Sequence, residues 1–106
     1  MLERHYQSSL IRALKRRFPG CIVLKNDSGY LQGFPDLTVL YKDKWAVLEV
    51  KGSADAHQQP NQEYYVGLLD EMSFAAFICP ENEEEVLRDL QQAFEPRRQT
   101  RLSQRK

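Results

Sequence analysis

The stretch that decides the fold runs from Pro35 to Lys51 and reads PDLTVLYKDKWAVLEVK. Two apolar segments, 37–41 and 45–50, flank the polar segment 42–44, and this pattern predicts a β-hairpin with a short turn. An antiparallel hairpin returns the end of its second strand to the start of its first, so Asp36 and Glu49 should converge. Lys51 follows Glu49 by two residues and should point to the same face.

The residue types in this cluster indicate a metal centre. Two carboxylates suit a hard divalent cation, and a neighbouring lysine can orient or help deprotonate an attacking water. Glu49 also lies in a nearly continuous apolar run, where an unpaired buried charge would be costly and a cation would remove the penalty. The cluster therefore predicts a metal-dependent phosphodiesterase. The alternatives are a turn aspartate at Asp36, a solvent-facing carboxylate at Glu49 and a salt-bridge partner at Lys51.

Length and composition indicate one soluble domain. The chain has 106 residues, of which 42% are hydrophobic and 28% charged, and this is enough to bury a core without disulfides. No apolar run approaches the ~20 residues of a membrane span, so we expect no membrane association and a cytoplasmic location. Cys21 and Cys79 lack the spacing of a zinc site, and we expect both to be buried free thiols in strands.

The charge balance bears on possible partners. The net charge is zero, with 15 basic and 15 acidic residues, which counts against a nucleic-acid-binding protein. The charges are segregated, however, since the segment 97–106 is basic and contains no acidic residue. A second basic cluster spans 12–17, and acidic residues gather at 81–85. This segregation permits a positive face on a neutral protein.

Apolar periodicity and turn residues predict seven elements in the order α-β-β-β-α-β-α. The helices are expected at 2–18, 60–72 and 83–94, and the strands at 21–24, 37–41, 45–50 and 73–79. The order indicates a single α/β layer structure, in which the last two strands are joined by a helix and should be parallel. The apolar stripes that we expect to face the core comprise Leu2, Tyr6, Leu10, Leu14 and Phe18, then Tyr65, Leu68 or Leu69 and Met72, and finally Val86, Leu87, Leu90, Ala93 and Phe94.

Two further polar side chains lie on core-facing stripes. Glu3 shares a helix face with Tyr6 and Leu10, which favours a ligand role, direct or through water; a frayed, solvated terminus is the alternative. Gln62 precedes inward residues of the second helix, an unusual place for an amide without partners. It could position Lys51, a metal-bound water or a base, and the alternative is a structural amide network.

Other polar residues are candidates for contact with nucleic acid. Lys25, Asn26 and Ser28 could touch a phosphate, although ordinary turn residues are an equal alternative. Arg97, Arg98 and Arg101 lie in a tail beyond Pro96 that we expect to be disordered, yet arginine pairs well with phosphate. His5 and His57 lack metal-ligand spacing and are expected at the surface.

The motifs Gly33-Phe34-Pro35-Asp36-Leu37 and Glu49-Val50-Lys51-Gly52, followed by Gln62, resemble the PD-(D/E)xK nuclease superfamily. Within it, the segment from about residue 3 to residue 79 is most similar to stand-alone virus-type replication-repair nuclease (VRR-Nuc) domains. The resemblance implies a restriction-endonuclease-like αβββαβ core whose four-stranded mixed sheet has the order 1-2-3-4. It also implies Mg²⁺ or Mn²⁺ bound by Asp36, Glu49 and the Val50 backbone carbonyl, with Glu3 as a further acid. Lys51 would orient or help deprotonate the attacking water, and Gln62 would correspond to the glutamine on the family's helix.

The function expected from the residues and the resemblance is that of a divalent-metal-dependent DNA endonuclease. Residues 1–95 would form the nuclease domain and 96–106 a basic tail. The resemblance favours a homodimer that acts on Holliday junctions or other branched DNA, in the cytoplasm of a bacterial or phage-infected cell. The alternative is a non-catalytic subunit for nucleic-acid binding or assembly that retains the nuclease fold.

Overall fold

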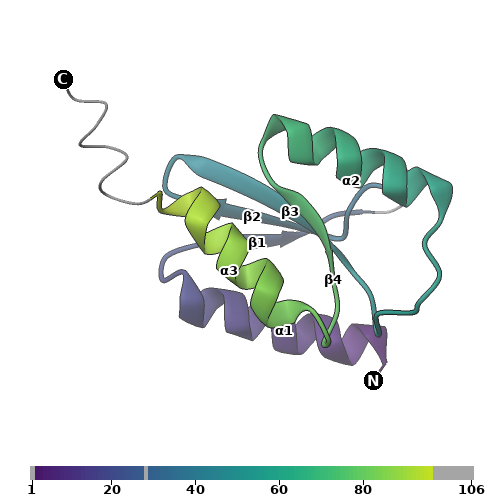
Figure 1. The fold of residues 1–106 in the computed structure, drawn as a ribbon, viewed down its shortest axis with the longest axis horizontal. Coiled ribbons are helices and arrows are strands. Elements are labelled where there is room, and N and C mark those ends of the chain that lie inside the picture. Colours follow the sequence, from purple (N-terminus) through teal and green to yellow (C-terminus); the bar gives the residue numbers. More distant parts are fainter. Residues whose placement is uncertain (1, 28, 97–106) are drawn as a thin grey trace.

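In the computed structural model, which describes residues 2–27 and 29–96, helices and strands follow one another in the predicted order (Figure 1). The elements are α1 (Glu3–Arg17), β1 (Ile22–Lys25), β2 (Leu37–Tyr41), β3 (Lys44–Val50), α2 (Pro60–Met72), β4 (Ala75–Ile78) and α3 (Glu83–Phe94). The prediction of an α/β protein with a mixed sheet is confirmed. The prediction that both cysteines are buried in strands is wrong in part, because Cys21 directly precedes β1 and is only half-buried, and the buried Cys79 directly follows β4.

The strands of this described region form one mixed sheet in the order β1-β2-β3-β4. β1, β2 and β3 pair antiparallel, and β4 pairs parallel to β3, as the intervening helix α2 predicted. The hairpin turn is tighter than expected, since Tyr41 pairs directly with Lys44. At the other end of the hairpin Leu37 pairs with Leu48, so the next residues outward, Asp36 and Glu49, face each other.

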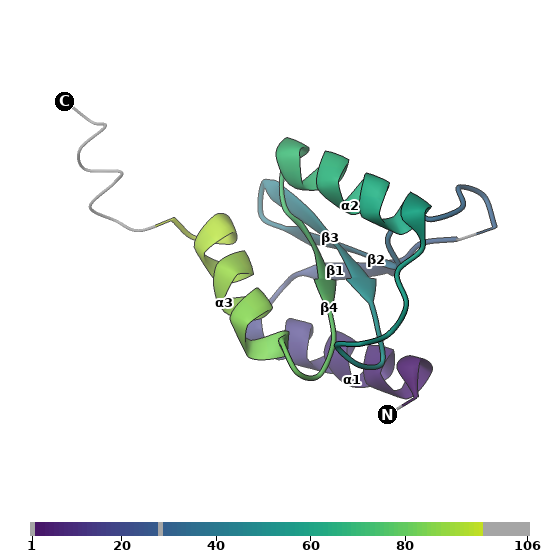
Figure 2. The same ribbon diagram turned by 45° about the vertical axis from the view of Figure 1, so that its right-hand side comes forward.

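Helices cover both faces of the sheet. α1 and α3 lie on one face and α2 on the other, as Figure 2 shows. The contacts of α2 concentrate on β3 and β4. β3 is therefore an interior strand with helices on both sides, which explains why its sequence is almost continuously apolar.

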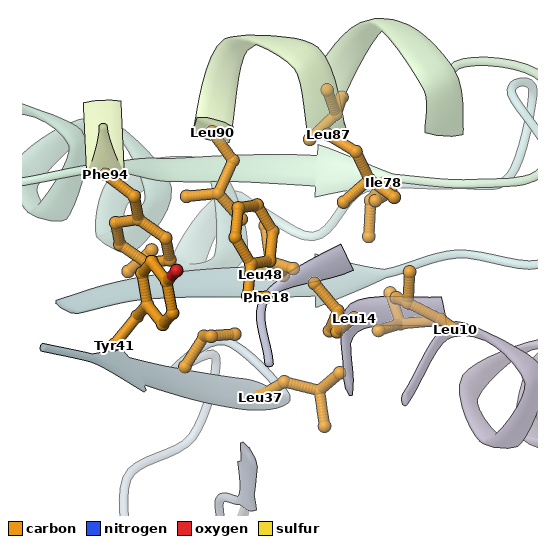
Figure 3. Close-up of a cluster of buried hydrophobic side chains, with 14 of the residues drawn as sticks. Leu10, Leu14, Phe18, Leu37, Tyr41, Leu48, Ile78, Leu87, Leu90 and Phe94 are labelled. Atoms are coloured by element: carbon orange, nitrogen blue, oxygen red, sulfur yellow. The ribbon is translucent and has the colours of Figure 1, made fainter. Parts of the chain in front are cut away.

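The main core lies between the sheet and the pair α1 and α3 (Figure 3). It is centred on the fully buried Phe18, whose ring lies 5.2 Å from Phe94 and 5.4 Å from Tyr41 between centroids. The other large buried side chains of this core include Leu10, Leu14, Leu37, Leu48, Ile78, Leu87 and Leu90. A smaller core beneath α2 consists of Val47, Val66, Leu69 and Ala75.

Three apolar residues that we expected in the core are exposed. Leu2, 58% exposed, precedes the first turn of α1, where no element covers it. Met72 is 62% exposed, and Ala93 is also on the surface. Both lie at the margins of helical stripes whose centres are the buried Leu69 and Leu90, and a margin position turns away from the sheet. Among the described residues, no helix is long and apolar enough to cross a membrane.

Candidate metal centre

The side chains of the candidate site project from the α2 face of the sheet. Successive residues of a strand alternate between faces, and Leu48 and Val50 belong to the core beneath α1 and α3. Glu49 therefore points toward α2, on the same side as Val47 of the smaller core. Alternation likewise directs Asp36 to this face, because Leu37 packs on the opposite one.

Asp36 is held at the end of the hairpin by backbone groups. Its Oδ2 accepts a hydrogen bond of 2.8 Å from the Val50 backbone N–H, which fastens the carboxylate to the last residue of β3. The preceding Pro35 is fully buried and anchors the chain entering β2. The structure therefore brings Asp36 and the end of β3 together, and it gives Val50 a role through its N–H besides the carbonyl that the resemblance emphasised.

Asn26 shapes the loop that carries Asp36. Its Nδ2 donates to the Pro35 carbonyl at 2.9 Å, and its Oδ1 accepts from the Thr38 hydroxyl at 3.1 Å. Its backbone N–H also donates to the Asp36 carbonyl at 2.8 Å. The side-chain amide of Asn26 thus connects the loop to β2. This favours the interpretation of Asn26 as a turn residue over a contact with phosphate.

Glu49 and Lys51 are the only buried charged residues in the part of the chain that the structure describes, at 3% and 8% exposure. The Lys51 Nζ lies 3.9 Å from Glu49 Oε2, and it donates to the His57 carbonyl at 3.0 Å and to Gln62 Oε1 at 2.8 Å. Two hydrogen bonds and the longer contact with Glu49 fix the position of the ammonium group. Lys51 is therefore immobilised beside the acid pair.

Gln62, in the first turn of α2, connects the two charged groups. Its Nε2 donates to Glu49 Oε2 at 2.8 Å, and its Oε1 accepts from Lys51 as well as from the Gln59 N–H at 3.0 Å. The contact with Gln59 is the side-chain half of a capping arrangement at the helix start, where Pro60 is the first helical residue. Helix capping and site geometry thus depend on the same amide.

Burial and mutual repulsion change the ionisation of the acids. Burial, and next the charge of Asp36, raise the pKa of Glu49 to about 8, although Lys51 opposes the change. Burial also raises the pKa of Asp36, against the lowering effects of the Val50 N–H and Lys51. The Glu49 carboxyl lies within hydrogen-bonding reach of Asp36 and can donate to it when protonated. Without a cation, the pair therefore retains a proton at neutral pH.

Glu3 lies near this centre but not in it. Glu3 is an exposed residue in the first turn of α1. Its carboxyl is nevertheless partly buried, and this burial, followed by the charge of Asp36, raises the pKa of Glu3. Among the described residues, no three His, Cys, Asp or Glu side chains are close enough together to hold a metal ion by themselves. A role for Glu3 through a bridging water stays a prediction.

The donor set fits Mg²⁺ or Mn²⁺ as the sequence predicts. Mg²⁺ is commonly bound by one or two carboxylates, with water and substrate phosphate completing its coordination. Asp36 and Glu49 supply the two carboxylates, and burial raises the pKa of both, so that a bound cation would favour their ionised forms. The Val50 carbonyl belongs to the same strand end as Glu49 and stays a predicted ligand.

The remaining candidate residues have varied positions. Lys25 is exposed at the end of β1, and the side chains of His5 and His57 are exposed, as expected. Ser28, Arg97, Arg98 and Arg101 lie outside the described residues. The sequence analysis missed the His57 carbonyl, because any residue of an irregular segment could supply such a backbone acceptor.

No family model, curated protein or solved structure matches this chain. The geometry of the site and the motifs that it carries indicate its chemistry.

Proposed function

We propose that this protein is a divalent-metal-dependent DNA endonuclease with a PD-(D/E)xK-type, restriction-endonuclease-like core. The observation that carries the proposal is the buried cluster in which Gln62 joins Glu49 to Lys51 while Asp36 faces Glu49 across the hairpin. When ionised, the buried Glu49 beside the half-buried Asp36 lowers the stability of the protein unless a cation binds the two carboxylates. Such a pair, with a fixed ammonium group beside it, suits phosphodiester hydrolysis.

The residues of the cluster have distinct roles in this proposal. When bound, Mg²⁺ or Mn²⁺ supplies positive charge that stabilises the phosphate oxygens and acidifies an attacking water. Asp36 and Glu49 hold that ion, and the Val50 N–H keeps Asp36 oriented toward Glu49. Lys51 orients the water or helps remove its proton, since its ammonium group is held beside Glu49. Gln62 positions both charged groups.

The substrate and the oligomeric state are proposed from the resemblance. We infer that the protein acts as a homodimer on Holliday junctions or other branched DNA, since two symmetry-related sites match the two-fold character of such substrates. The second candidate function is a non-catalytic subunit for nucleic-acid binding or assembly. The acid pair argues against it, because a scaffold gains nothing from burying Glu49 beside a second carboxylate.

Cleavage assays test the proposal. Labelled duplex, flap and four-way-junction DNA would be incubated with the protein in Mg²⁺, Mn²⁺ or EDTA. We expect metal-dependent cleavage, and we expect Asp36→Asn, Glu49→Gln and Lys51→Ala each to lower the rate by about 10²- to 10⁴-fold. Glu71→Gln, an exposed carboxylate on α2, is the matched control and should cleave normally. Normal cleavage by Glu49→Gln would reject the site, and binding of branched DNA without cleavage in any metal would favour the second candidate.

A further inference from the structure

A cavity adjoins the candidate metal centre. Residues 29–33 of the loop before β2 and the first turn of α2 line a partly open cavity of about 610 Å³. Gln62 lines this cavity and also contacts Glu49 and Lys51, so the cavity and the centre share a wall. Its volume falls within the ~300–1,000 Å³ range of sites that bind small organic groups. Figure 2 shows the loop beside this end of α2.

A close backbone approach builds the cavity into the fold. Gly33 has a φ of +89°, and a Cβ at this position would lie 2.4 Å from the Cβ of Asn61. Residues other than glycine are disfavoured by both the conformation and the space. The loop is therefore packed directly against the start of α2.

The chemistry of the lining is neutral and amide-rich. Gln32, Gln59 and Asn61 line the cavity, and the lining includes no charged side chain. Within residues 2–27 and 29–96, the side-chain amides of Gln32 and Asn61 have no hydrogen-bond partner, in contrast to that of Gln62. An amide presents two donors and an acceptor side by side, which matches the edge of a nucleobase. The lining contains no arginine or lysine, the side chains that pair most strongly with phosphate.

We propose that this cavity binds an unpaired nucleobase of the DNA substrate, beside the phosphate held at the metal centre. The proposal rests on the proposed nuclease function and narrows its substrate class. A base can enter this cavity and use its edge for amide contacts only when it has left the helical stack. The preferred substrate is therefore DNA with an unpaired nucleotide next to the cleaved bond, as at a branch point, rather than continuous duplex.

The first test is cleavage of branched DNA that carries a single abasic site, moved one nucleotide at a time past the cleaved bond. For the wild type, we expect one position at which loss of the base lowers kcat/KM by about tenfold, the size of one good amide–base contact. For Gln32→Ala combined with Asn61→Ala, loss of that base should have no further effect. Gln92→Ala, an exposed amide on α3, is the matched control and should keep the wild-type response.

A second test does not depend on cleavage. The same DNA with the fluorescent base 2-aminopurine at that position would be titrated with protein in EDTA. A fluorescence change that is lost in Gln32→Ala, with an unchanged melting temperature, supports the cavity. If this change occurs but no metal supports cleavage, the cavity stands and the nuclease function is wrong. If DNA is cleaved equally well with abasic sites at every position, the cavity proposal is wrong while the nuclease function stands. If the fluorescence change persists in the variants, the cavity proposal is wrong, and the cleavage assays decide the nuclease function separately.

Discussion

At the scale of single residues, Glu49 depends most on its surroundings. It is buried at 3% exposure, faces another acid and contacts Gln62 and Lys51. Burial, and next the charge of Asp36, raise its pKa from 4.5 to about 8, although Lys51 opposes the change. The ionisation of Glu49 should therefore affect both the stability of the folded protein and its affinity for a cation.

The raised pKa predicts how the stability of the metal-free protein changes with pH. The folded state keeps a proton on Glu49 up to about pH 8, whereas the unfolded chain releases it near 4.5. The stabilising contribution is therefore complete below the unfolded pKa and is lost as the pH rises through the folded pKa. We expect the melting temperature in EDTA to fall over this interval. Glu49→Gln should flatten the fall, and Glu71→Gln should not; an equal fall in Glu49→Gln would contradict the assignment.

Cation binding should reverse this loss of stability. A cation that binds only the folded state raises the free energy of unfolding by mass action, and it relieves the repulsion between Asp36 and Glu49. We expect millimolar Mg²⁺ or Mn²⁺ to raise the melting temperature, and more so above the folded pKa of Glu49 than below it. Asp36→Asn should abolish the increase. A melting temperature that does not respond at either pH, measured by calorimetry, would count against the centre.

At the scale of elements, the segment from Gly33 to Asp36 has two functions. Its aspartate supplies the site, and its glycine permits the loop to pack on α2 at Asn61. α3, about which the resemblance says little, completes the core by packing Leu90 and Phe94 against the sheet and α1. The helix thus stabilises the face of the sheet opposite the site.

The close approach at Gly33 can be tested by substitution. Gly33→Ala places a Cβ in a region of positive φ and against Asn61, so we expect a loss of about 1–3 kcal/mol in the free energy of unfolding. Gly67→Ala is the matched control, because a Cβ there meets nothing within 4 Å. In the middle of α2 this change should instead stabilise the protein by about 0.5–1 kcal/mol. Urea denaturation measures both, and equal stability of the two variants would show that the loop does not pack as described.

At the scale of the whole molecule, the face of the sheet that carries α2 is incompletely covered at β1. β1 is an edge strand, and its residues Ile22 and Leu24 are 55% and 46% exposed. α2 contacts β3 and β4 on that face rather than β1.

At the two ends of the sheet, Cys21 and Cys79 are free thiols next to opposite edge strands, in agreement with the predicted strand order.

For the proposed homodimer, we expect the exposed apolar residues of β1 to mediate self-association. Light scattering should give twice the mass of 12.4 kDa, and Ile22→Lys combined with Leu24→Lys should return the mass to that of one chain. Met72→Lys, which also replaces an exposed apolar residue, should leave the dimer intact. A dimer linked from one active and one Asp36→Asn chain should nick a single strand. A monomeric mass with full cleavage activity would exclude the dimer.

The sequence by itself determined the order of the elements, the hairpin and the convergence of Asp36 with Glu49. Each follows from local periodicity and from the geometry of antiparallel strands, which few residues control. The inward position of Gln62 was also visible, because an amide stood out on an apolar helix stripe.

Only the tertiary structure decided which margin positions are buried and which backbone groups complete the site. Met72 and Ala93 carry the same apolar signal as their buried neighbours, and their exposure depends on where the sheet lies beneath each helix. The His57 carbonyl that holds Lys51 is a group that every residue possesses, so no side-chain pattern marks it. The cavity exists because a loop and a helix that are distant in sequence pack together at Gly33 and Asn61, and such packing is a property of the whole fold.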